Sequence, residues 1–88
     1  MTLREYLERF AKVGEIIVIR ERGWQIALTQ ADNDNLYIHS LHPRLLELYS
    51  VVNFEYARRE WATKPVLVVD ILPTTEVTKH VRKRMVSR

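Results

Sequence analysis

The 88-residue chain contains no cysteine, only two glycines and three prolines. The absence of cysteine excludes a disulfide scaffold, a thiol nucleophile and a cysteine-ligated zinc site. Because Gly14 and Gly23 are the only glycines, no glycine-rich loop is available to cradle a phosphate group. So little glycine and proline also leaves little of the chain for a linker, and the length predicts one folded domain.

Long apolar runs are absent as well. The longest aliphatic runs, residues 16–19 and 66–69, are far shorter than the roughly 20 residues that span a bilayer. Acidic residues such as Glu5 interrupt the N-terminal segment where a signal peptide needs an apolar core. We therefore expect a cytoplasmic protein that does not span or bind a membrane.

The net charge of +3 is unevenly distributed. Residues 1–72 carry nine Lys and Arg side chains against ten Asp and Glu, whereas residues 73–88 carry five basic side chains against Glu76 alone. The first part therefore has a net charge of −1 and the second +4. We expect an α+β core domain over residues 1–72 and a basic helical segment over residues 73–88.

The first half of the chain predicts a helix followed by a β-hairpin. Thr2 and Glu5 have the spacing of a capping box at the start of a helix. The buried face of that helix is expected to hold apolar residues three or four apart, which are Leu3, Tyr6, Leu7 and Phe10. Residues 16–19 and 24–30 are predicted as strands around a turn at Gly23, and residues 36–40 as a short third strand.

The second half predicts a short helix and a second hairpin. Pro43 suits the first turn of a helix. Residues 51–59 and 66–72 are predicted as strands, and the latter form the most hydrophobic run of the chain. Pro73 ends this run, and a helix is expected to follow it. The predicted fold is α+β, with an antiparallel sheet of four to five strands (two hairpins), an N-terminal helix, a short middle helix and a C-terminal basic helix.

This order resembles a group of small bacterial and phage-encoded α+β domains of unknown function. The resemblance is carried by Leu3–Phe10, by residues 15–19, by Leu45 with Leu46, and by residues 66–71. It covers most of the chain but includes no diagnostic motif and implies no activity. The basic tail and the long segment of residues 31–40 depart from the pattern.

Catalytic and metal-binding patterns are weak in this sequence. His39 and His42 have an H-x-x-H spacing near Asp32 and Asp34, but on a strand-to-loop path the two rings need not converge, and His42 before Pro43 is typical of a residue at the start of a helix. No serine lies in a nucleophile elbow. We expect no enzyme activity, no metal site and no cofactor.

Asp70 lies within an apolar run, where a buried carboxylate needs a partner. Arg58 or Arg59 on the neighbouring strand is the expected partner, in a structural ion pair.

Two functions fit the remaining features. The first is a small non-enzymatic protein-interaction or accessory module that binds another protein or a second copy of itself, with an interface that includes Tyr56, Trp61, Val77, Val81 and Met85. The alternative is a nonspecific nucleic-acid-binding accessory protein, because clustered cations displace counterions from phosphates without reading sequence. Its binding residues would be Lys79, Arg82, Lys83, Arg84 and Arg88. The same cations are also typical of a solvated terminus that aids solubility.

Overall fold

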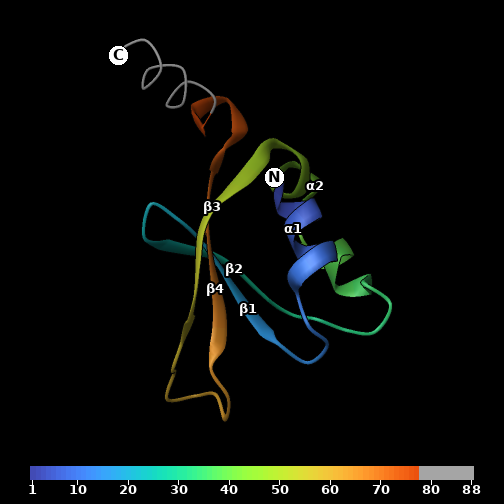
Figure 1. The fold of residues 1–88 in the computed structure, drawn as a ribbon, viewed down its shortest axis with the longest axis vertical. Helices are drawn as coiled ribbons and strands as arrows, with labels where there is room; N and C mark the ends of the chain where they lie inside the picture. Colours follow the sequence, from blue (N-terminus) through green and yellow to red (C-terminus); the bar gives the residue numbers. More distant parts are fainter. Residues whose placement is uncertain (78–88) are drawn as a thin grey trace.

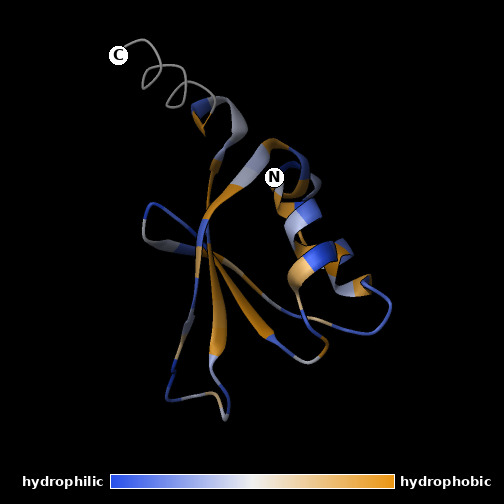
Figure 2. Cartoon of the chain, viewed as in Figure 1, coloured by the Kyte–Doolittle hydropathy of each residue, from blue (hydrophilic) through white to orange (hydrophobic). Residues whose placement is uncertain are grey.

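The fold places the two most apolar strands at the centre of a four-stranded sheet. A computed structural model describes residues 1–77 (Figure 1). Its elements are α1 (Leu3–Phe10), β1 (Ile16–Glu21), β2 (Trp24–Gln30), the 3₁₀ helix η1 (Leu36–Ser40), α2 (Pro43–Leu48), β3 (Tyr49–Ala57) and β4 (Val66–Pro73). The strand order is β2-β1-β4-β3, and Figure 2 shows the apolar residues concentrated in β1 and β4. Both central strands are thereby covered on each side by a neighbouring strand.

The α+β class and the two hairpins are confirmed, but the prediction of a purely antiparallel sheet is wrong. β1 pairs antiparallel with β2, and β3 pairs antiparallel with β4. The two hairpins join through β1 and β4, which run parallel. This arrangement follows from hydrophobicity, because it buries the first strand of one hairpin against the last strand of the other. The sheet is therefore mixed.

The prediction of a short strand over residues 36–40 is also wrong, because these residues form η1. Asp32 Oδ1 accepts hydrogen bonds from the backbone N–H groups of Asp34 and Leu36, and Asn35 adopts a left-handed conformation with φ 57°. These contacts wind the chain before it reaches Tyr37 and Ile38, which are consecutive and both buried. An alternating strand would bury only one of such a pair.

The helices cover one face of the sheet (Figure 1). Leu3 and Leu7 of α1, with Leu46 of α2, pack there against alternate residues of the central strands, including Ile17, Ile19, Leu67, Val69 and Ile71. The Tyr37 hydroxyl donates to the Leu7 carbonyl and ties η1 to α1. A smaller cluster of Val18, Val66 and Val68 lies on the opposite face, packed by Ile16, Ala57 and Ala62.

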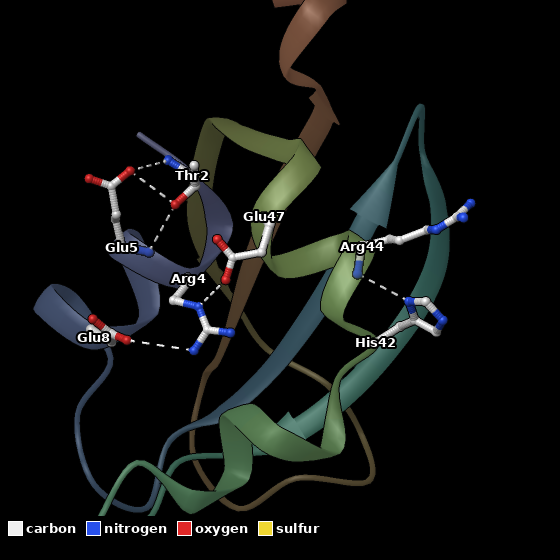
Figure 3. Close-up of polar contacts among 7 residues, drawn as sticks. All are labelled: Thr2, Arg4, Glu5, Glu8, His42, Arg44 and Glu47. Carbon is white, nitrogen blue, oxygen red and sulfur yellow. Dashed lines mark hydrogen bonds and ion pairs between the residues drawn. The ribbon is translucent and has the colours of Figure 1, made fainter.

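Local polar contacts fix the helix starts as the sequence predicted (Figure 3). The capping box is complete, with Thr2 Oγ1 accepting from the Glu5 N–H and Glu5 Oε1 accepting from the Thr2 N–H. His42 Nδ1 accepts from the Arg44 N–H at the start of α2. An ion pair between Arg4 and Glu47 then links α1 to α2.

The chain leaves the sheet where Pro73 predicted it would. Residues 74–77 have helical backbone, so the start of a helix after β4 is confirmed. The rest of the predicted basic helix lies outside the described residues. Within residues 1–77, no helix is long and apolar enough to cross a bilayer.

Candidate interaction surface

β3 forms an outer edge of the sheet, and only the start of that edge is covered. Thr2 bridges Ser50, and the Val51 N–H donates to the Met1 carbonyl. Among residues 1–77, no strand pairs with the outward edge of β3 beyond this point. A stretch of backbone donors and acceptors from residue 52 to residue 57 is therefore open to a further strand.

The side chains along this open edge are unusually apolar for an exposed strand. Phe54 and Tyr56 are each 54% exposed, and Val52 is exposed beside them. Phe54 lies opposite Val69 and Tyr56 opposite Leu67, so both aromatic rings are on the helix-covered face of the sheet. The helices leave Phe54 and Tyr56 uncovered, although both lie opposite core residues of β4. We call these two exposed aromatic residues the apolar strip.

Helix α1 extends the apolar strip. The Tyr6 ring, itself buried, lies 5.7 Å from the Phe54 ring and 5.3 Å from the Phe10 ring between ring centroids. Burial also raises the pKa of Tyr6. Phe10 was expected in the core but is 53% exposed at the last residue of α1. Met1, Tyr6 and residues 51–54 line a shallow hollow of about 290 Å³ at the other end of the strip.

A second hollow, of about 720 Å³, lies at the far end of β3. It is lined by residues 12–16, Gln30, Tyr56 and residues 63–65. Within it the Tyr56 hydroxyl donates a hydrogen bond of 2.6 Å to Glu15 Oε2. This hydrogen bond, together with burial, raises the pKa of Tyr56 to about 12. Glu15 Oε1 also accepts from the Lys12 N–H at 2.7 Å, so one carboxylate fixes the turn after α1 to the end of β3.

Comparison with protein-family models, curated proteins and solved structures finds no match to this chain. The candidate surface is therefore defined by its geometry alone.

The opposite face of the sheet carries a charged cluster across three strands. Arg20 of β1 forms two hydrogen bonds to Asp70 of β4, Nε to Oδ1 at 2.8 Å and Nη2 to Oδ2 at 3.1 Å. The same Nη2 lies 3.5 Å from Glu55 Oε1 of β3. The hydrogen bond that Arg20 donates to Asp70 raises the pKa of Arg20. Arg58 and Arg59 were the expected partners of Asp70, but the parallel pairing sets Arg20 directly beside it.

The sequence-predicted interface residues are distributed over separate places. Tyr56 lies in the strip along β3, whereas Trp61 is 57% exposed in the connection between β3 and β4. Val77 is partly buried at the end of the described residues. Val81 and Met85 lie outside the described residues, as do all five residues of the predicted nucleic-acid site.

Sequence reasoning missed Phe10, Val52 and Phe54 as surface residues. Phe10 has the helical spacing of a core residue, and Phe54 shares the strand alternation of Tyr56. Neither pattern distinguishes an exposed apolar residue from a buried one. The signal that could have singled them out is the position of β3 at the sheet edge. That position depends on how the hairpins dock.

Two of the four polar residues considered for metal binding, His42 and Asp32, have local structural partners. His42 caps α2, and Asp32 holds the turn that precedes η1. In the described part of the chain, no group of three or more His, Asp or Glu side chains is arranged to hold a metal ion.

Proposed function

We propose that this chain is a non-enzymatic protein-interaction module that binds through the open edge of β3. The observation that carries the proposal is the coincidence, on residues 52–57, of an unpaired strand edge with exposed apolar side chains. A strand edge supplies backbone hydrogen bonds to an added strand, and alternate side chains supply selectivity. Phe54, Tyr56 and Phe10 would contact the side chains of the added strand on the helix-covered face.

The charged residues around this surface support binding rather than catalysis. Glu15 is engaged with Tyr56 and the Lys12 backbone, and Asp70 is engaged with Arg20. Each of these carboxylates joins two elements of the fold, which is a structural role. The aromatic side chains are the groups left accessible, and aromatic residues are enriched at protein interfaces.

The test uses random peptides displayed on phage, selected against the whole chain. Binding of the selected peptides should slow amide hydrogen exchange over residues 53–57. Phe54→Lys should weaken binding at least about tenfold, or about 1.4 kcal/mol, because a charge replaces the central apolar contact.

Leu28→Lys is the matched control for this variant. Leu28 is 51% exposed on β2, at the other edge of the sheet, and lies opposite Val18 on the other face. Peptides whose binding is lost in Leu28→Lys but kept in Phe54→Lys would refute the proposal, as would a selection that yields no binder for a chain that is itself monomeric.

A second candidate function, nonspecific nucleic-acid binding, is favoured by the charge of residues 78–88. These residues hold five Lys and Arg side chains and no Asp or Glu. Such a segment can bind a phosphate backbone by counterion release.

A further inference from the structure

We infer that the partner strand at the β3 edge is β3 of a second copy of this chain, paired antiparallel about a twofold axis at Phe54. This inference rests on the proposed function and names its partner. Joining two β3 edges would merge the two sheets into one continuous sheet. The twofold arrangement makes the same surface serve both copies.

The side-chain pattern of β3 is self-complementary about Phe54 over its regular part, residues 53–57. In an antiparallel pair centred there, Phe54 faces its own copy, and Tyr56 lies beside the bulge at Val52 of the other copy on each side. All three residues are exposed and apolar in the single chain. Aromatic pairs and pairs of aromatic with β-branched residues are among the favourable cross-strand combinations.

Charge selects the same register. With Phe54 at the centre, Glu55 faces Asn53 of the other copy, and the carboxylate meets a neutral amide. Moving the centre to Glu55 sets two carboxylates opposite each other, which is unfavourable. Moving it to Asn53 would require Val51, whose N–H is already bonded to the Met1 carbonyl.

Backbone regularity also favours β3 over the other outer strand. Beyond its bulge at Val52, β3 pairs with β4 without interruption from Asn53 to Ala57, so its outer edge is regular over the same residues. β2 is instead interrupted at mid-strand, where Ile26 bulges between Gln25 and Ala27. η1 also lies against β2, with Ser40 Oγ 3.4 Å from Thr29 Oγ1.

The absence of cysteine makes a direct test possible, because any introduced thiol is the only one in the chain. Sedimentation of the wild-type chain over a range of concentrations should show a monomer–dimer equilibrium. Under mild oxidation, Phe54→Cys should form a disulfide at least about tenfold faster than Glu55→Cys. The reason is that residues directly opposite in an antiparallel pair have the Cα separation that a disulfide needs, whereas Glu55 faces residue 53.

A mixture of two variants provides an independent readout of the register. Asn53→Cys and Glu55→Cys should each cross-link slowly alone and quickly when mixed, giving the mixed disulfide. Both positions are exposed, so this readout stands even if Phe54→Cys folds poorly. Circular dichroism of the reduced variants checks that they are folded.

Two results would overturn the inference. One is a chain that stays monomeric at every concentration, and the other is a dimer in which neither Phe54→Cys nor the mixture cross-links preferentially. A monomer that still binds displayed peptides at residues 53–57 would refute self-pairing alone. A chain that neither dimerises nor binds peptides there would refute the proposed function as well.

Discussion

Arg20 and Asp70 form the most constrained charged contact among the described residues. Two near-parallel hydrogen bonds hold the guanidinium against the carboxylate on a partly buried surface of the sheet. This two-point geometry is stronger and more directional than a single ion pair. The pair therefore fastens β1 to β4 at the junction between the two hairpins.

Asp70→Asn should lower the free energy of unfolding by about 1–2 kcal/mol, because it removes a charged acceptor and leaves the Arg20 guanidinium only partly paired. The measurement is urea unfolding followed by circular dichroism. Glu55→Gln is the matched control, and it should cost less than about 0.5 kcal/mol because Glu55 is exposed and lies farther from Arg20. Equal losses in the two variants would contradict a special role for the Arg20–Asp70 pair.

The Tyr56 hydroxyl predicts a pH dependence at the alkaline end. Its pKa of about 12 in the folded chain lies above the ordinary tyrosine value of 10.0, because the neutral phenol donates to Glu15. The stabilisation from this group is therefore full below pH 10 and is lost as the pH rises through 12. Tyr56→Phe should lose stability less steeply than the wild type between these values, as measured by urea unfolding at each pH.

One further variant tests the role of the hydrogen-bond acceptor. Glu15→Ala should also lose stability less steeply with pH than the wild type, because it removes the acceptor and lets the Tyr56 pKa fall. The pKa of Tyr37 is also raised to about 12, chiefly by burial and partly by the charges of Asp32 and Glu15, so its contribution should be common to the wild type and Tyr56→Phe. An unchanged pH profile in Tyr56→Phe would show that the hydrogen bond to Glu15 does not act on stability.

At the scale of elements, α1 is the helix whose start is best defined by its sequence. Thr2→Ala should destabilise the chain by about 1 kcal/mol, since it removes the side-chain acceptor for the Glu5 N–H. Thr2→Ser keeps that acceptor and should stay close to the wild type in urea unfolding. A large loss in Thr2→Ser would instead point to the contacts of the Thr2 methyl group.

The sequence predicted an element correctly where interactions between residues close in sequence determine its structure. The capping box at Thr2, the turn at Gly23 and Pro43 at the start of α2 each act within a few residues, and each was placed correctly. The strand prediction for residues 36–40 is wrong because the turn held by Asp32, rather than their own composition, determines that they form a helix. The prediction that Phe10 is buried is wrong because helical spacing shows which residues share a face but does not show how much of that face is covered.

The relation between the two hairpins was beyond the reach of sequence patterns. β1 and β4 are separated by more than 40 residues, and their parallel pairing depends on burying two apolar strands together. The same docking leaves β3 at the edge and exposes Phe54. Tyr56 is therefore the only residue of the candidate surface that the sequence analysis named as an interface residue. The apolar strip that includes it depends on how the two hairpins are arranged in the whole molecule.

At the scale of the whole molecule, the charge division gives a test of the nucleic-acid alternative. Binding of the full chain to a DNA or RNA duplex should weaken steeply with added salt, and deletion of residues 78–88 should abolish it. Electrophoretic mobility shift at several salt concentrations measures both effects. Binding that persists in the truncated chain would contradict a role for the basic segment.

The central position of β4 also has a consequence for synthesis of the chain. β1 leaves the ribosome early, but its parallel neighbour follows only after some 50 further residues, which takes roughly 3–10 s at ordinary elongation rates. During that interval the first hairpin presents Ile17 and Ile19 without the strand that later flanks them. Until β4 is made, β1 and β2 can form only an isolated two-stranded hairpin, which is at best marginally stable in water.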